Sequence, residues 1–414
     1  MSDPQVISFG CRLNIHESEL IRERLGEAQL EHAVVFNTCA VTNEAVRQAR
    51  QAIRRMKREK PEARIIVTGC AAQTEGAHFA AMAEVDLVLG NAEKLDAQHY
   101  QFSGEKLRVN DIMAVRETAG HLVQGFSGNT RAFLQIQNGC DHRCTFCIIP
   151  FGRGPSRSVP AGVIVEQIRE LVAKGYREAV LTGVDITAYG EDLPGRPKLG
   201  NLVRRILKLV PELERLRLSS IDSAAADEDL FAAFAQESRL MPHVHLSLQS
   251  GDDMILKRMK RRHSQAQAVA FCEALRAARP DIVLGADFIA GFPTETDAMF
   301  ANTMQAVRDL GLTHLHVFPF SARPGTPAER MPQLDGRVIR ARAKALRELG
   351  QAQLAAFLSR ETGATRKVLI EMDGNGRSEH YAPVRFNQKH QPGSIIAARI
   401  TGAGADHLIG ELQP

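Results

Sequence analysis

Three cysteines stand within eight residues of one another in the stretch GCDHRCTFCIIP: Cys140, Cys144 and Cys147. Zinc is one candidate metal, but a structural zinc site takes four ligands, usually as two CxxC-like pairs or as a CxxC with a histidine pair. No second pair accompanies this one, and His142 lies too close in the loop to complete a relaxed tetrahedral site. Soft thiolates in this arrangement favour an iron–sulfur cluster instead. Three thiolates on a four-iron cluster leave one iron open for a ligand that is not a protein side chain.

A second set of cysteines is dispersed along the chain. Cys11, Cys39 and Cys70 are 28 and 31 residues apart, yet each directly follows a strand-like run, in SFGC, FNTC and VTGC. The carboxyl ends of parallel strands lie along one edge of a sheet, so three such loops bring three thiols together there. Three unrelated buried cysteines are the alternative. The repeated placement predicts a second cluster with an open iron, whereas Cys272, in a helical pattern, is expected to pack in a core.

The first hundred residues alternate strand-like and helical patterns. Strands are predicted at 6–9, 34–36, 65–68 and 87–89, and helices near 17–28, 43–59 and 75–84. Such alternation predicts an α/β domain with a parallel sheet and right-handed crossovers. Residues 100–130 are mixed in character and are expected to form a connector.

A second alternating series follows this connector. Strands are predicted at 133–137, 179–184, 216–221, 244–249, 283–290 and 314–320, and helices near 160–174, 199–210, 227–236, 264–278, 296–310 and 335–358. Six strand–helix units are too few for a closed eight-stranded barrel and predict an open, partial one. Cys140 follows the first strand of this series, at the strand end where barrel enzymes build their active sites.

The tail changes character near residue 360. Short β-branched runs separated by glycine-rich turns predict a small antiparallel β-barrel, for which RNA binding and a purely structural role are both open. The expected domains are therefore residues 1–120, 126–358 and 359–414.

Composition sets few limits on function. The chain has 414 residues, a net charge of +4 and 44% hydrophobic residues, which is ordinary for a globular protein of two or three domains. Residues 47–60 hold seven Lys or Arg against one Glu, and residues 257–263 read KRMKRRH; such runs are more often solvated helix faces than polyanion sites. No leader or long apolar run is evident, which predicts a cytoplasmic protein without a membrane segment. In that reducing compartment the seven cysteines are expected to be thiols or metal ligands.

Motifs from all parts of the chain resemble the radical-SAM methylthiotransferase family. VISFGCRLNIHESE, VFNTCAVTNEAVRQAR and VTGCAAQ are similar to the family's N-terminal cysteine motifs, and the tail resembles its RNA-binding TRAM domain. NGCDHRCTFCIIPFGRGPSRS, LTGVDITAYG, HLSLQSG and ADFIAGFPTET resemble its radical-SAM core. RLSSID and HLSLQSG look most like the bacterial branch that acts on N6-threonylcarbamoyladenosine at position 37 of tRNA. The branches acting on isopentenyladenosine, or on an aspartate of a ribosomal protein, read differently around Gln249.

The resemblance implies a two-part reaction and its cofactors. A [4Fe–4S] cluster on Cys140, Cys144 and Cys147 would reduce S-adenosylmethionine to methionine and a 5′-deoxyadenosyl radical, which removes hydrogen from C2 of the adenosine. Sulfur would come from an auxiliary [4Fe–4S] cluster on the N-terminal cysteines, and a second S-adenosylmethionine would supply the methyl group. An electron donor such as flavodoxin or ferredoxin is implied.

The resemblance also points to residues around the cofactor. The expected contacts are Phe146, Thr182, Gly183, Val184, Asp185, Gln249, Ser250, Gly291 and Phe292. For Asp185, capping of a helix is the alternative. Arg153 and Arg157 suit a carboxylate or phosphate, with a solvated loop as the alternative. A non-catalytic iron–sulfur or zinc module that binds RNA is the hypothesis of another class.

Overall fold

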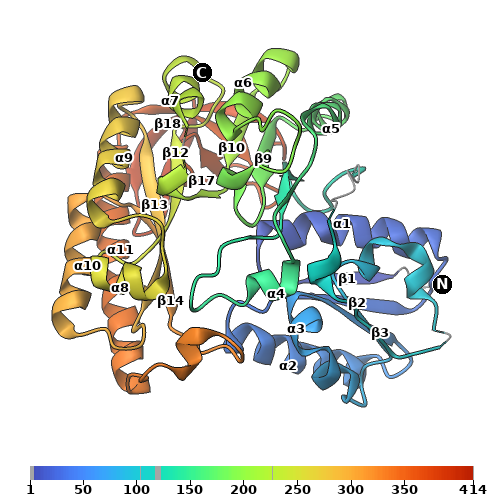
Figure 1. The fold of residues 1–414 in the computed structure, drawn as a ribbon. Helices are drawn as coiled ribbons and strands as arrows, with labels where there is room; N and C mark the ends of the chain where they lie inside the picture. The colour runs from blue at the N-terminus through green and yellow to red at the C-terminus, as the bar shows by residue number, and fades with distance from the viewer. Residues whose placement is uncertain (1–3, 103, 117–122, 226, 414) are drawn as a thin grey trace.

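The computed structural model describes residues 4–102, 104–116, 123–225 and 227–413 of the chain (Figure 1). The segment up to β5 forms one parallel sheet with its helices, shown in blue, beside a larger strand-and-helix unit in green and yellow. The red tail lies behind the strands of that larger unit. The predicted boundary between residues 120 and 126 falls partly on residues 117–122, which lie outside the described residues.

The N-terminal sheet has the strand order β1-β2-β3-β4-β5, and all its pairs are parallel, as predicted. Its strands are β1 Gln5–Ser8, β2 Ala33–Thr38, β3 Arg64–Gly69, β4 Leu87–Leu89 and β5 Leu107–Arg108, and its helices are α1 Arg12–Glu27, α2 Asn43–Glu59 and α3 Cys70–Ala80. The two-residue β5 extends the sheet into the stretch expected to be a connector.

Two helices of this unit begin earlier than predicted. α1 begins at Arg12 rather than near residue 17, because its first turns bury polar side chains such as Asn14 and Glu17, which hydrophobic periodicity does not register. α3 begins at Cys70, directly after Gly69, whose φ of 95° ends the strand sharply. The predicted start at residue 75 coincides instead with a kink inside α3, where Glu75 has non-helical dihedral angles.

The central unit is an open parallel barrel, as predicted. Its strands run in the order β6-β9-β10 and then β11-β12-β13-β14. They are β6 Arg131–Gln135, β9 Glu178–Thr182, β10 Arg215–Leu218, β11 Ser220–Ile221, β12 His243–Gln249, β13 Val283–Ala290 and β14 His314–Pro319. The predicted third strand is split at Ser219 into β10 and β11, so the six predicted units are all present.

Helices cover the outside of this barrel close to the predicted positions. They are α5 Ala161–Ala173, α6 Leu199–Leu209, α7 Glu228–Gln236, α9 Gln265–Ala278, α10 Asp297–Asp309 and α11 Gly336–Arg360. The short strands and α-helices that were not predicted include β7 Gln137–Asn138, α4 Ile149–Arg153, β8 Arg157–Ser158 and α8 Asp253–Met259. None of the helices among the described residues combines the length and apolar character needed to cross a bilayer.

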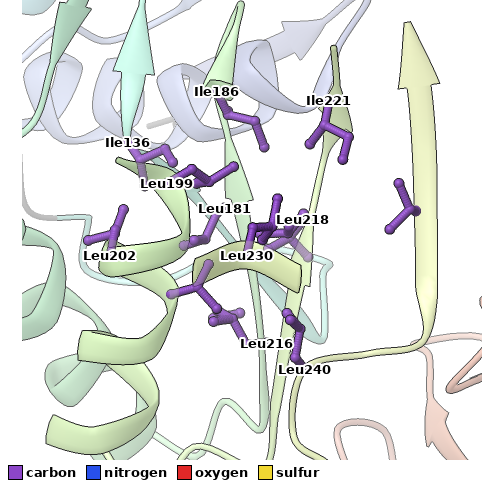
Figure 2. Close-up of a cluster of buried hydrophobic side chains, with 14 of the residues drawn as sticks. Ile136, Leu181, Ile186, Leu199, Leu202, Leu216, Leu218, Ile221, Leu230 and Leu240 are labelled. Carbon is purple, nitrogen blue, oxygen red and sulfur yellow. The ribbon is translucent and has the colours of Figure 1, made fainter. Parts of the chain in front are cut away.

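The main core lies between the strands and the outer helices. Figure 2 shows Leu181, Leu216 and Leu218 of the strands facing Leu202 of α6 and Leu230 of α7. Cys272 of α9 is buried in the same core, as expected. Successive strand residues point to opposite faces, so the alternate side chains of these strands point into the barrel interior, here called the lumen.

The tail is a closed five-stranded barrel in the order β15-β16-β17-β19-β18. Its strands are β15 Thr365–Ile370, β16 Gly376–Ser378, β17 Pro383–Phe386, β18 Ile395–Ala403 and β19 Leu408–Leu412. The prediction of a purely antiparallel barrel is wrong in one pair, because β17 runs parallel to β19 to close it.

The tail covers the starts of the central strands. Arg215, which opens β10, donates to the carbonyl of Lys367 at 2.7 Å, and Val283, which opens β13, packs in the tail's own core. Tyr381 of the tail stacks on His243, which opens β12, with ring centroids 5.2 Å apart. The tail therefore closes the amino-terminal end of the lumen and leaves the carboxyl-terminal end to the Cys140 loop.

Candidate active site

The Cys140–Cys147 loop is held at the carboxyl-terminal end of the barrel by hydrogen bonds from Thr145. Its amide donates to the carbonyl of Met259 at 3.0 Å and its hydroxyl to that of Arg258 at 2.8 Å, and its carbonyl accepts from Ala328. Gly139 enters the loop with a φ of 74°, where a Cβ would lie 1.8 Å from the carbonyl oxygen of Pro155. The backbone therefore needs glycine directly before Cys140.

The three thiols of this loop lie near enough to influence one another. Burial, the Asp185 carboxylate and the thiols of Cys147 and Cys144 raise the pKa of Cys140 to about 12. Burial and then the Cys144 thiol raise the pKa of Cys147 to about 12. Such thiols are poor free nucleophiles at neutral pH, whereas a metal takes them as thiolates and releases their protons.

The Arg261 side chain brings a positive charge to this group of thiols. The Arg261 guanidinium lies 3.6 Å from the sulfur of Cys144 and donates to the Ser247 carbonyl at 2.6 Å and to the Asp222 carboxylate at 3.0 Å. Three clustered sulfur donors and a neighbouring positive charge fit an iron–sulfur cluster with a position left open.

The second set of cysteines also comes together in the structure. Cys11 directly precedes α1, Cys39 follows β2, and Cys70 is the first residue of α3. A Cβ on Gly10 would lie 3.0 Å from the Cys39 sulfur. Burial and the Cys70 thiol raise the pKa of Cys39 to about 12, and burial and the same thiol also raise that of Cys11. The sheet edge thus gathers the three thiols that the spacing in the sequence predicts.

Arg153 anchors this second group. Its Nε donates to the Cys70 sulfur at 3.0 Å and its Nη2 to the Asn14 side chain at 2.6 Å, and the guanidinium pairs with Glu17. Lys94 pairs with the same carboxylate at 2.7 Å. Burial would raise the pKa of Glu17, but Arg153 and Lys94 outweigh it and lower the pKa to about 2.

The charges of this buried network do not cancel. Arg153 and Lys94 contribute two positive charges, and Glu17 contributes one negative charge. A thiolate at Cys70 would balance the excess, as it would when Cys70 binds a metal. Asn91 adds a second donor, at 3.8 Å from the Cys70 sulfur. The donor set at this edge therefore also fits a cluster held by thiolates.

The solvated-loop alternative for the two arginines after the Cys140 loop is wrong. Arg153 is 2% exposed and Arg157 is 5% exposed. Arg157 donates to the carbonyls of Arg153 and Pro155. Both side chains are buried and form hydrogen bonds within the protein.

The two cysteine groups face each other across α4. This helix begins two residues after Cys147 and carries Gly152, where a Cβ would lie 3.3 Å from that of Cys70. The Cys70 thiol also contributes to raising the pKa of Cys147. A molecule held at the Cys140 group is therefore adjacent to the N-terminal group.

The backbone amides of the loop after β9 donate to a side chain of the short strand β7. Gly183 leaves no room for a side chain, because a Cβ would lie 2.7 Å from the Gln137 carbonyl. The amides of Val184 and Asp185 donate to the Gln137 side chain at 3.0 and 2.9 Å, and Thr182 is buried at the strand end. These residues lie beside β7, which leads into the Cys140 loop.

Asp185 does not act as a helix cap. It precedes a 3₁₀ helix, Ile186–Ala188, but its side chain makes no capping bond. Its carboxylate accepts from Thr187 and pairs with Nε2 of His142 at 3.0 Å. The side chain thus faces the Cys140 loop, and the capping alternative is wrong.

The remaining expected contacts line the same end of the barrel. Phe146 and Phe292 meet edge to face with ring centroids 6.5 Å apart. Gly291 has a φ of 76° and lies against α11, where a Cβ would lie 2.8 Å from the Ile339 side chain. Gln249 ends β12 with a φ of 72°, which is uncommon for a side chain of its size. Ser250 is buried and shares a hydrogen bond with Thr303.

Part of the basic run 257–263 is not a solvated helix face. α8 ends at Met259, Lys260 adopts a φ of 60°, and the chain then turns Arg261 toward Cys144. His263 is 5% exposed. The run in α2 does present its cations to solvent, because the helix buries only Val46, Ala49 and Ile53.

At the other end of the lumen, Tyr381 is surrounded by arginines. The guanidinium carbons of Arg12, Arg131, Arg217 and Arg377 lie 4.7 to 5.5 Å from its ring centroid. Burial would raise the pKa of Tyr381, but Arg131, Arg12 and Arg377 outweigh it and lower the pKa to about 7. N-terminal, central and tail residues all contribute to this cluster.

Replacing Tyr381 with phenylalanine is expected to destabilise the protein more at pH 9 than at pH 6.5. The tyrosine pKa is depressed in the folded state, so its contribution is lost as the pH falls through 7 and grows between 7 and 10. The difference in free energy of unfolding should increase by roughly 2 kcal/mol over this range. Urea denaturation of both proteins at the two pH values checks this, and a difference independent of pH would contradict it.

Comparison with known families covers most of the chain. Residues 134–307 match the radical SAM superfamily, and residues 4–90 match the uncharacterized protein family UPF0004. The chain is 54% identical over 398 residues to the threonylcarbamoyladenosine tRNA methylthiotransferase MtaB of Rickettsia prowazekii, covering 96% of this chain and 94% of that protein. It is 35% identical to a tRNA-2-methylthio-N(6)-dimethylallyladenosine synthase of Cereibacter sphaeroides, covering 98% and 97%.

Among solved structures, the chain resembles the radical S-adenosylmethionine methyltransferase TsrM of Kitasatospora setae. The TM-score is 0.58 at 14% sequence identity, covering 79% of this chain and 74% of TsrM, which supports the fold alone. The similarity to full-length relatives in sequence is far stronger, and it extends across both cysteine groups and the tail. The chain therefore belongs to the radical-SAM methylthiotransferase family.

Proposed function

We propose that this protein adds a methylthio group to C2 of N6-threonylcarbamoyladenosine at position 37 of tRNA. The observation that carries the proposal is the meeting of two three-cysteine groups across α4. It occurs in a chain that is 54% identical, nearly end to end, to a relative named for this reaction. One group serves hydrogen removal and the other serves sulfur delivery, and their adjacency lets a single adenine face both.

The residues of the barrel end hold the first group of cofactors. The superfamily uses a [4Fe–4S] cluster and S-adenosylmethionine, which together supply a carbon-centred radical. Cys140, Cys144 and Cys147 would hold that cluster, and Arg261 offsets its negative charge. Phe146 and Phe292 form an apolar wall that excludes water from a reactive species.

The residues of the sheet edge would hold an auxiliary [4Fe–4S] cluster. Cys11, Cys39 and Cys70 supply the thiolates, and Arg153 donates to the Cys70 sulfur. Hydrogen bonds of this kind stabilise a thiolate and tune the potential of a cluster. A flavodoxin or ferredoxin in the cytoplasm would supply electrons.

The chain divides naturally by these roles. Residues 1–120 carry the auxiliary group, residues 126–358 carry the radical-SAM group, and residues 359–414 would contact tRNA. In this assignment the contacts of Tyr381 with the arginine cluster position the tail against the other two units.

Mass spectrometry of tRNA nucleosides tests the proposed function. The reconstituted protein, given S-adenosylmethionine and a reductant, is expected to convert threonylcarbamoyladenosine in an anticodon stem–loop to its 2-methylthio derivative. Conversion of isopentenyladenosine instead would assign the related activity. Modification of a ribosomal-protein aspartate without RNA would make the substrate a protein. Absence of any cleavage of S-adenosylmethionine would favour a non-catalytic RNA-binding module.

Replacing Arg385 and Lys389 together with alanine is expected to weaken tRNA binding. Both are exposed on the tail, beside Phe386 and His390, whose rings meet edge to face at 4.8 Å. Each lost phosphate contact should reduce the slope of log affinity against log salt concentration by about 0.7–0.9. Binding titrations at several salt concentrations check this, with Lys344→Ala on α11 as control. An unchanged affinity at matched salt would give the tail a structural role.

A further inference from the structure

The lumen of the barrel is polar along one wall. Alternation along β12 places His243, His245 and Ser247 on the face opposite the core leucines. On β13 and β14 the corresponding inward residues include Asp287 and His316. Parallel barrels usually fill this space with branched apolar side chains. A wall of histidines and a carboxylate is therefore suited to binding a polar group.

This wall is open toward the cysteine end and closed at the other. The side chain of His316 is 57% exposed and that of Asp287 is 19% exposed, whereas His245 is 5% exposed. Asp287 accepts from Nε2 of His245 at 2.9 Å and lies 3.1 Å from Nδ1 of His316. The three side chains are thus already ordered by mutual contacts, and His316 presents the rest of its ring to the lumen.

The deeper part of the lumen contains a buried histidine whose ring nitrogens can still form hydrogen bonds. His243 is 2% exposed, and within the described part of the chain neither of its ring nitrogens has a hydrogen-bond partner. Buried polar atoms are normally satisfied, so unpaired ones point to a polar ligand or to water. His243 stacks on Tyr381, which places these ring nitrogens at the closed, amino-terminal end of the lumen.

Arg12 brings a positive charge to the same place, beside the Tyr381 hydroxyl. Of the four arginines around Tyr381, Arg131 and Arg377 pair with Glu371, and Arg217 pairs with Glu178. Arg12 forms no ion pair with any carboxylate of the described residues, and its Nη2 lies 3.3 Å from the Tyr381 hydroxyl. Its charge also contributes to lowering the pKa of His243 and His245, after burial. A half-buried guanidinium in this position suits a carboxylate.

The position of Arg12 brings this charge close to one of the two cysteine groups. It directly follows Cys11 of the auxiliary group. From the other side, Arg261 joins the Cys144 sulfur to the Ser247 carbonyl, and His245 lies two residues below Ser247 on β12, about 6–7 Å along the strand. On adenine, the atom C2 is separated from the carbon that bears N6 only by N1. A base with C2 between the two cysteine groups can therefore extend its N6 substituent toward this wall.

We infer that Arg12, with the wall of His245, Asp287 and His316, forms the site that binds the amino-acid part of the N6-threonylcarbamoyl group. Arg12 receives the carboxylate, and His316 and Asp287 receive the hydroxyl and ureido groups. The inference rests on the proposed function and deepens it, because it identifies what selects the substrate. An isopentenyl group would leave Arg12 and these polar side chains unpaired, which is how a polar site rejects an apolar analogue.

Three anticodon stem–loops test this inference by binding, without turnover. One carries threonylcarbamoyladenosine at position 37, the second carries its methyl ester, and the third carries plain adenosine. The reconstituted wild-type protein is expected to bind the acid about 10- to 100-fold more tightly than the ester, as a charge-assisted pair would give. Arg12→Gln should reduce this preference to below about threefold, and its affinity for the plain hairpin is the reference against which this loss is measured.

Two further variants test the inference even if Arg12→Gln fails to fold. Tyr381→Phe removes the hydroxyl partner of Arg12 but keeps the guanidinium, so its preference for acid over ester should be at least that of the wild type. His316 is largely exposed, so His316→Ala should fold, and it should weaken binding of the acid and the ester several-fold relative to the plain hairpin. Equal wild-type affinity for acid and ester, or an undiminished preference in Arg12→Gln, would overturn the inference.

The same three hairpins, together with a fourth that carries isopentenyladenosine, separate failure of this inference from failure of the proposed function. If nucleoside mass spectrometry finds a methylthio group on threonylcarbamoyladenosine while Arg12→Gln discriminates like the wild type, only the inference fails. If the protein modifies plain or isopentenylated adenosine and leaves the threonylcarbamoyl hairpin unchanged, both fail.

Discussion

Replacing Cys140, Cys144 and Cys147 together with alanine is expected to abolish cleavage of S-adenosylmethionine and to remove about half of the bound iron. Two four-iron clusters correspond to about eight iron atoms per chain after anaerobic reconstitution. The N-terminal thiols lie on a separate sheet edge with their own arginine, so their iron should remain. Iron analysis and detection of 5′-deoxyadenosine in the same preparations provide the measurement.

Two other cysteine variants complete this experiment. Cys39→Ala should still produce 5′-deoxyadenosine, because the Cys140 group is intact, but should deliver no sulfur to tRNA. Cys272→Ala is the matched control, since Cys272 packs in the hydrophobic core away from both groups. Stoichiometric zinc in place of iron would refute the assignment of both sites. Loss of S-adenosylmethionine cleavage in a folded Cys39→Ala protein that keeps the first cluster would refute the division of roles.

Arg153→Leu is expected to destabilise the protein by about 1–3 kcal/mol, because buried acceptors lose their hydrogen bonds while Lys94 still balances the charge of Glu17. Glu17 would keep only Lys94, and the Asn14 side chain and the Cys70 sulfur would each lose a donor. Urea denaturation of the protein before reconstitution measures this cost independently of bound iron. After reconstitution, the iron held by the N-terminal cysteines should also fall.

A surface arginine provides the control for this prediction. Arg204 of α6 pairs with Asp229 at 2.6 Å, but both side chains are about half exposed. Arg204→Leu should therefore cost less than about 1 kcal/mol. Similar unfolding midpoints for Arg153→Leu and Arg204→Leu would show that the buried network around Glu17 contributes little to stability.

The sequence predicts the strands and the cysteine groups well because both depend on local patterns. Apolar runs identify buried parallel strands, and a cysteine at the end of each of three strands indicates one shared edge. The start of α1 could not be predicted in this way, since its first buried residues, Asn14 and Glu17, are polar. Their partner Arg153 is distant in sequence and reads as a loop residue, so only the folded chain reveals the pair.

The same reason explains the other residues that pattern analysis missed. Arg261 lies between the exposed residues Lys260 and Arg262, and nothing local distinguishes the one side chain that turns toward Cys144. Arg12 and Tyr381 meet across 369 residues. Contacts between units depend on how the units pack, and a hydrophobic period carries no information about that packing.

The position of α4 limits how this enzyme can be recombined. Ile149–Arg153 belongs to the radical-SAM segment by sequence, yet Gly152 and Arg153 pack on Cys70 of the N-terminal sheet. A chimera that exchanges the N-terminal unit between relatives, and cuts the chain in the connector, would separate Arg153 from the Asn14 and Glu17 with which it pairs. The unit that can be exchanged is therefore discontinuous in sequence. The five residues of α4 must be exchanged together with the first hundred residues of the chain.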